Sequence, residues 1–400
     1  MFASVLLPLL AVYGLTAQWS HPYHIDALTN AITGWYIGNE QTVVAHRHQP
    51  FIEEGQHGNA AWFEESPEGE PVSQYPPGAA LVVGLFYAVA PVEMEMVRYQ
   101  GSNRPDLAPV DVPLPPLWPA TLSAVIVTAL ACATLGLTFY ELSRSPRAAI
   151  AGGLLAGLAT GAWAVAARMS WMHGPAMLAV ALAMLGLQRQ RWGWAGAALG
   201  FAILCRPHLA VIAATVGLGL AATRRSMGPL IRIGLTSGAG LALLLAYNRA
   251  VWGRLSISGG YGSDFTERFA RAGLGWFLDN VVAALFDRQH GLLTWAPFLV
   301  VLLAGAIIAR RKLRDWTVFA AVGGLVYLII QLRANRFSGG DGHFGYRYPL
   351  EPMVAAAPLL FSGHWHWVRD RPVARMALSV GLAIGLLGQI LGAVAGIVRV

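Results

Sequence analysis

Charged residues are scarce in this chain of 400 residues: Asp, Glu, Lys and Arg together make up 12% of it, whereas a soluble domain typically carries about 25%. Only two cysteines are present, Cys132 and Cys205, and both lie inside apolar runs, so no disulfide framework is expected. The chain also lacks a Walker A loop, a glycine-rich dinucleotide fingerprint and a His-Glu-x-x-His motif. These absences exclude the common soluble nucleotide-binding and zinc-dependent enzymes.

Long apolar runs fill most of the chain, in which 56% of residues are hydrophobic. The runs that could cross about 30 Å of hydrocarbon are 2–19, 116–141, 148–166, 173–188, 192–205, 207–223, 229–250, 291–309, 316–333, 350–363 and 375–398. The first run has no charge before it and no small-residue cleavage site after it, which favours a retained helix over a signal peptide. We therefore predict an all-α integral membrane protein, a bundle of about 11–12 transmembrane helices.

The distribution of charge predicts the orientation of this bundle. Basic residues gather in the short loops 142–147, 188–191, 224–232, 310–315 and 364–374, which the positive-inside rule assigns to the cytoplasm. The long loop 20–115 is acidic and belongs outside, together with 251–290 and 334–349. The net charge of +7 follows from this topology and gives no reason to expect nucleic acid as a partner. We expect a multi-pass protein of the cytoplasmic (inner) membrane, in contact with lipid.

The stretch from Tyr75 to Pro91 is apolar but has only about 13 residues between prolines, and acidic residues flank both sides of it. A span there would place one acidic flank in the cytoplasm. We predict a re-entrant or interfacial helix.

Asp26 follows the first apolar run and begins a stretch whose apolar residues have helical spacing. A carboxylate on an interfacial helix could meet a water-soluble group and a lipid headgroup together. The same position is also typical of a helix N-cap, which would have no chemical role. The position of Asp26 leaves both interpretations open.

Three arginines lie at predicted outer ends of spans: Arg168, Arg206 and Arg347. Positive charge there runs against the insertion bias and needs a separate reason. The guanidinium fork matches phosphate oxygens in a bidentate way and stays charged at any relevant pH, so phosphate binding is one reason. Snorkelling, or pairing with outer carboxylates, is the other.

Seven short motifs occur along the chain in an order typical of one family. They are His24-Ile-Asp26, Ser73-Gln-Tyr-Pro-Pro-Gly-Ala-Ala80, Trp118-Pro-Ala120, Trp171-Met-His-Gly-Pro-Ala176, Cys205-Arg-Pro207, Gln289-His-Gly-Leu-Leu293 and Phe344-Gly-Tyr-Arg-Tyr348. Their order resembles the GT-C glycosyltransferases, polytopic enzymes that use polyprenyl-phosphate-linked sugars. Within that superfamily the chain is most similar to the bacterial branch related to dolichyl-phosphate-mannose-protein mannosyltransferases.

The resemblance implies a division of the chain and a role for particular residues. A GT-C-like catalytic module would cover 1–250, including outer loop 20–115, and further transmembrane helices would follow in 251–400. Asp26 would be the catalytic base or a metal ligand. The remaining implied site residues are Arg347, Arg206 and Arg168 for the donor phosphate, and His24, Tyr75, His173, His343 and Tyr346 as substrate contacts.

The resemblance also raises the question of a divalent metal, Mg²⁺ or Mn²⁺. Many members carry two adjacent acids where this chain has Asp26 followed by Ala27. Glu53 or Glu54 could supply the second carboxylate by folding back towards Asp26. Metal dependence is therefore open at this stage.

The function we expect is transfer of a sugar from a polyprenyl-phosphate-linked donor to a glycan, lipid or protein acceptor on the outer side of the membrane. The alternatives are a polytopic transporter or lipid flippase, and a non-catalytic GT-C-like assembly subunit. Coupled transport usually places an ionisable residue at mid-membrane, and the middle of the predicted spans carries almost none. No clear inverted repeat is present either.

Overall fold

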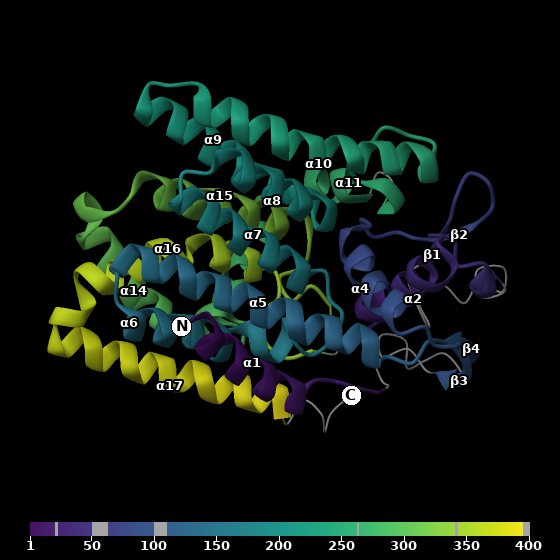
Figure 1. Cartoon of the computed structure of the whole chain (residues 1–400), viewed down its shortest axis with the longest axis horizontal. Coiled ribbons are helices and arrows are strands. Elements are labelled where there is room, and N and C mark those ends of the chain that lie inside the picture. The colour runs from purple at the N-terminus through teal and green to yellow at the C-terminus, as the bar shows by residue number, and fades with distance from the viewer. Residues whose placement is uncertain (21–22, 50–62, 100–109, 262–263, 341–342, 395–400) are drawn as a thin grey trace.

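The structure is a computed structural model that describes residues 1–20, 23–49, 63–99, 110–261, 264–340 and 343–394. Helices form almost all of it, and two small antiparallel sheets lie at one end of the bundle (Figure 1). The long helices α5 and α10 run along the bundle, and the sheets lie beyond the end that α2 and α4 cover.

Helix occupies every predicted span. The helices are α1 Phe2–Thr16, α5 Trp118–Ser143, α6 Pro146–Leu158, α7 His173–Gln188, α8 Trp192–Cys205, α9 Ala210–Arg224, α10 Gly228–Trp252, α14 Phe298–Ile308, α15 Asp315–Ala334, α16 Leu350–His366 and α17 Pro372–Val394. In the described part of the chain, five helical segments are long and apolar enough to cross a membrane, namely α5, α9 with the turn before it, α10, α15 and α17. The predicted helical membrane bundle is confirmed.

Two predicted spans are broken, and two helices were not predicted. The run 148–166 divides into α6 and a π-helical turn, Ala162–Ala166. The run 291–309 divides into α13 Leu292–Trp295 and α14, because Pro297 has no backbone N–H to donate to the preceding turn. The unpredicted helices are α11 Asp264–Arg271 and α12 Leu274–Phe286. The second of these exposes Leu274, Trp276 and Leu278, an apolar surface that we had assigned to an outer loop.

The described part of loop 20–115 forms a compact unit over one end of the bundle (Figure 1). It contains α2 Ile25–Trp35, the π-helical turn Tyr36–Glu40, the 3-10 turn His46–His48, β1 Phe63–Glu65, β2 Pro71–Ser73, α4 Gly78–Val89, β3 Glu95–Tyr99 and β4 Val110–Leu114. Strand β1 pairs with β2, and β3 pairs with β4, both antiparallel.

Helix α4 packs against α2 at a point where neither backbone has room for a side chain. A Cβ at Gly34 would collide with the side chain of Val83, and one at Gly84 would collide with Ile37. All residues of α2 are buried as a result of its packing against α4 and the bundle. Helix α4 is 12 residues long, or about 18 Å, which is too short to cross the hydrocarbon. That this segment is re-entrant or interfacial stays a prediction.

Candidate active site

Asp26 lies in the first turn of α2 and is 8% exposed. The helix begins after His24, whose ring Nδ1 accepts a hydrogen bond of 3.2 Å from the backbone N–H of Asp26. His24 is therefore the N-cap, and the carboxylate of Asp26 is not used for capping. The N-cap interpretation is therefore wrong, and the functional interpretation stays a prediction.

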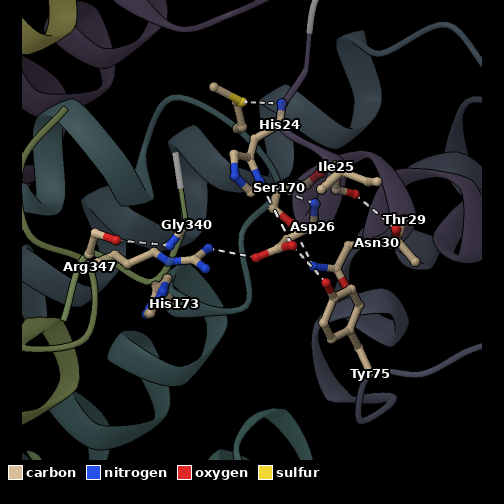
Figure 2. Close-up of polar contacts among 12 residues, drawn as sticks. His24, Ile25, Asp26, Thr29, Asn30, Tyr75, Ser170, His173, Gly340 and Arg347 are labelled. Atoms are coloured by element: carbon tan, nitrogen blue, oxygen red, sulfur yellow. Dashed lines mark hydrogen bonds and ion pairs between the residues drawn. The ribbon is translucent and has the colours of Figure 1, made fainter. Parts of the chain in front are cut away.

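The partners of the Asp26 side chain are a phenol and a guanidinium (Figure 2). Tyr75 Oη donates a hydrogen bond of 2.7 Å to Asp26 Oδ1, and Arg347 Nη1 donates one of 2.6 Å to Asp26 Oδ2. Burial opposes ionisation of Asp26, but the positive charge of Arg347, the nearby His24 and these hydrogen bonds outweigh it and lower the pKa of Asp26 to about 2. Asp26 is a carboxylate at any physiological pH.

A glycine-rich loop between α15 and α16 places Arg347. Gly339 and Gly345 have φ values of +74° and +85°, which residues with a side chain rarely adopt. A Cβ on Gly339 would also collide with Nε of Arg347, so the bend lies directly against the guanidinium. The guanidinium carbon lies 4.9 Å from the ring centre of Trp171 and 5.4 Å from that of Tyr348. The Ser338-Gly-Gly340 bend thus fixes the arginine, and Figure 2 shows Gly340 beside it.

A second buried ion pair lies next to the first and includes a residue that sequence reasoning missed. Glu351, in the first turn of α16, has no exposed surface. Its Oε1 lies 2.9 Å from His173 Nδ1 and 3.7 Å from Arg206 Nε. Arg206 Nη1 is also 3.3 Å from His173 Nε2. Arg206, His173 and Glu351 therefore form one polar group among the helix ends.

Tyr348 connects the two ion pairs. Its ring centre lies 5.6 Å from the guanidinium carbon of Arg206 and 5.4 Å from that of Arg347. Both are within the range of cation–π attraction. Tyr261 lies close by, with its ring centre 5.8 Å from that of Tyr75. Aromatic faces and two guanidinium groups thus surround the carboxylate of Asp26.

Two other predicted site residues lie away from Asp26, and a third lies at the edge of the site. Arg168 donates hydrogen bonds of 3.0 Å to the backbone oxygen of Gly392 and to Gln18 Oε1, so it joins α17 to the end of α1 rather than facing Asp26. Tyr346 is 2% exposed and belongs to the apolar core. His343 packs at the edge of the site, with its ring centre 5.7 Å from Trp171, and burial lowers its pKa well below the usual value.

The described residues do not fit a divalent metal at Asp26. Both carboxylate oxygens already accept hydrogen bonds, and the nearest charge to them is a guanidinium. In the described ranges no group of three His, Cys, Asp or Glu side chains could hold a metal ion. Glu53 and Glu54, the carboxylates that could have completed such a group, lie outside those ranges. We therefore derive no step from a metal.

An apolar cavity of about 180 Å³ lies inside the bundle. Leu350, Val354, Ala357, Phe361 and His364 line it along one face of α16. Leu350 directly precedes Glu351 in the chain, and from Leu350 the cavity follows the helix for about 20 Å. Helices α5, α6, α7, α14 and α17 supply the other walls. Helix α16 thus carries Glu351 of the site in its first turn and the cavity wall from Leu350 onwards.

The fold is similar to that of a solved membrane protein. The comparison finds the crystal structure of ArnT from Cupriavidus metallidurans bound to undecaprenyl phosphate, with 15% sequence identity and a TM-score of 0.55 over 98% of this chain and 75% of that chain. No protein-family model and no curated protein sequence matches this chain. At this identity the likeness shows the fold: a mostly helical, polytopic membrane protein arranged like ArnT.

Proposed function

We propose that this protein is a GT-C-type membrane glycosyltransferase that transfers a sugar from a polyprenyl-phosphate-linked donor. The observation that carries the proposal is the buried contact between Asp26 and Arg347, which brings a proton acceptor and a phosphate-binding group to one point. The likeness in fold to ArnT, a protein solved with undecaprenyl phosphate, supports the choice of donor.

In the proposed reaction, the hydroxyl of the acceptor attacks the anomeric carbon of the donor sugar and gives its proton to the carboxylate of Asp26. The bond between that carbon and the phosphate oxygen breaks, and the oxygen keeps the electron pair. Arg347 and Arg206 stabilise the negative charge that develops on the departing lipid phosphate.

Donor binding would also change the basicity of Asp26. A carboxylate with a pKa of about 2 is a weak base as long as Arg347 pairs with it. A phosphate that takes a hydrogen bond from Arg347 competes with Asp26 Oδ2 for the same guanidinium. Asp26 then loses part of the positive charge that lowers its pKa, so it becomes a better proton acceptor when the donor is present.

The apolar cavity supports a lipid-linked donor rather than a soluble one. Its wall residue Leu350 lies between Arg347 and Glu351 in sequence, so the lipid chain of a donor whose phosphate binds the arginines could enter the cavity along α16. The position of Asp26 in the acidic loop 20–115 leads us to place the reaction on the outer side of the cytoplasmic membrane.

The test is the lipid that cells accumulate when Asp26 is replaced. We expect Asp26→Asn, as the sole copy, to cause accumulation of a polyprenyl-phosphate-linked sugar, detected by mass spectrometry of lipid extracts, because proton acceptance is lost while the shape of the side chain is kept. Asp315→Asn, at an exposed first turn of α15, is the matched control and should leave the lipid profile unchanged. A well-folded Asp26→Asn protein with a normal profile would remove Asp26 from catalysis and favour the transporter or the assembly subunit.

A further inference from the structure

Glu351 has no role in the reaction proposed above, although it is the most completely buried carboxylate of the site. Its side chain has no exposed surface. Oε1 forms the contact with His173 and the ion pair with Arg206. Oε2 is buried and has no hydrogen-bond partner in the described structure. A buried carboxylate oxygen without a donor is costly, so this residue needs a functional reason.

Each arginine of the site is paired with one carboxylate. Arg347 faces Asp26, and Arg206 faces Glu351. The four charges sum to zero, so each guanidinium already has a carboxylate before any phosphate arrives. A bound phosphate is therefore attracted by two arginines and repelled by two carboxylates at close range.

The balance between arginines and carboxylates affects how strongly the lipid phosphate is bound after the sugar has been transferred. The phosphodiester of the donor carries one negative charge. Cleavage of the bond to the sugar leaves a phosphomonoester with up to two, while the proton of the acceptor hydroxyl goes to Asp26. Two arginines bind the doubly charged product more strongly than the donor, so an arginine pair without nearby carboxylates would keep the product.

We propose that Glu351 is a positioning residue that holds Arg206 and His173 and lowers the affinity of the arginine pair for a lipid phosphomonoester, so that the product leaves the site. This inference rests on the proposed function. Asp26 cannot serve the same purpose throughout the cycle, because it accepts the proton and becomes neutral as the product forms. Glu351 keeps its charge and remains the repelling group at that moment.

The experiment measures binding of undecaprenyl phosphate to the purified full chain in phosphatidylcholine nanodiscs, which supply no anionic competitor. Glu351→Gln should bind it about tenfold more tightly or better than wild type, because a like charge beside the phosphate is removed. The affinity should also fall more steeply with salt. Glu351→Asp retains the charge and should stay within about threefold of wild type.

Glu141→Gln is the matched control, since Glu141 also pairs with an arginine, Arg189, at 2.7 Å, but at the far end of α5 and α7. It should bind like wild type. Thermal melting verifies that each variant is folded. In turnover with the donor, Glu351→Gln should lower kcat and KM together, which loss of structure would not do.

Binding of undecaprenyl phosphate by folded Glu351→Gln that is equal to or weaker than that of wild type would overturn the inference. A tenfold change in the affinity of Glu351→Asp would overturn it as well. The Glu351→Asp measurement tests the inference even if Glu351→Gln does not fold. The proposed function fails separately, if wild type does not bind undecaprenyl phosphate or if Arg206→Gln and Arg347→Gln leave that binding unchanged. Inorganic phosphate in the same assay should compete only weakly. Competition as strong as that of undecaprenyl phosphate would show a site for free phosphate and overturn the lipid-linked assignment.

Discussion

Arg347 Nη1 lies 2.6 Å from Asp26 Oδ2, although the two residues are 321 positions apart in the sequence. The contact joins the first turn of α2 to the loop that precedes α16, and both side chains are buried. Breaking such a pair by removing one partner leaves an uncompensated charge, which is strongly destabilising. The pair is therefore both a structural link and the centre of the proposed chemistry, and variants must separate these two roles.

Replacing Arg347 by lysine separates charge from geometry. Lysine keeps the positive charge but lacks the planar fork that matches phosphate oxygens. We expect Arg347→Lys to lower the rate of sugar transfer roughly tenfold to a hundredfold, with Arg347→Gln lower still, in single-turnover measurements. Arg254→Lys, on the exposed surface of outer loop 251–290, should have no effect. Equal rates for Arg347→Lys and wild type would show that only charge is needed.

Replacing Tyr75 by phenylalanine removes the hydroxyl that donates to Asp26 Oδ1. Because hydrogen bonds to the charged form lower a pKa, the pKa of Asp26 should rise from about 2 towards its ordinary value. A hydrogen bond to a charged group is worth roughly 1.5–3 kcal/mol, so the melting temperature should fall. Transfer at neutral pH should change less than about fivefold, since Asp26 stays ionised. Complete loss of transfer in the folded variant would make the Tyr75 hydroxyl a catalytic group.

The pKa of Asp26 also predicts how stability depends on pH. A pKa of about 2 in the folded protein lies below that of an unfolded aspartate, roughly 3.9. Ionised Asp26 therefore contributes stability that is fully present above about pH 4 and is lost as pH falls towards 2. The contribution is of order 2 kcal/mol. The difference in melting temperature between wild type and Asp26→Asn should be constant from pH 8 to 5 and shrink below pH 4. A difference that grows on acidification would contradict the lowered pKa.

Two neighbouring alanines of α16 test the apolar cavity. Ala357 lines it, whereas Ala356 does not, and both are half-buried. Phenylalanine at position 357 fills part of a cavity of about 180 Å³, so Ala357→Phe should weaken binding of undecaprenyl phosphate about tenfold while Ala356→Phe leaves it unchanged. The Kd values of the two variants in nanodiscs are the measurement. Equal affinities would place the lipid chain outside the cavity.

The orientation predicted from the charged loops can be tested by cysteine labelling. Single cysteines at Ser143 and Thr223, near the cytoplasmic ends of α5 and α9, should not react with an impermeant reagent added from outside. A cysteine at Leu255, which is 73% exposed in an outer loop, should react. Native Cys132 and Cys205 are buried and can be replaced first. Labelling of Ser143→Cys from outside would reverse the topology.

The helices of the bundle were readable from the sequence because each apolar run carries its own signal of length and composition. Loop 251–290 was not, because α12 mixes apolar residues with Asp279 and Asn280 and is only 13 residues long. The division of run 291–309 could have been anticipated from Pro297, since proline disfavours helix in the residue before it.

The candidate site was predictable where a residue stood out from its surroundings. Arg206 and Arg347 stood out as charges at the ends of apolar runs, and both lie in the site. Arg168 had the same signal but binds Gly392, because a sequence position does not state in which direction a side chain points. Glu351 was missed because it is the second residue of an apolar run, 350–363, that was predicted to span the membrane. Its partner His173 is 178 positions away, and no local pattern reports such a contact.

The two ion pairs join segment 1–250 to segment 251–400 with opposite polarity. Segment 1–250 supplies the anion of one pair, Asp26, and the cation of the other, Arg206, while segment 251–400 supplies Arg347 and Glu351. During synthesis, Asp26 and Arg206 reach the membrane before their partners. They stay unpaired, hydrated or bound by the insertion machinery, until the last helices are inserted. If the gene is split between α10 and α11 and both fragments are made together, the two segments should recognise one another through these complementary charges.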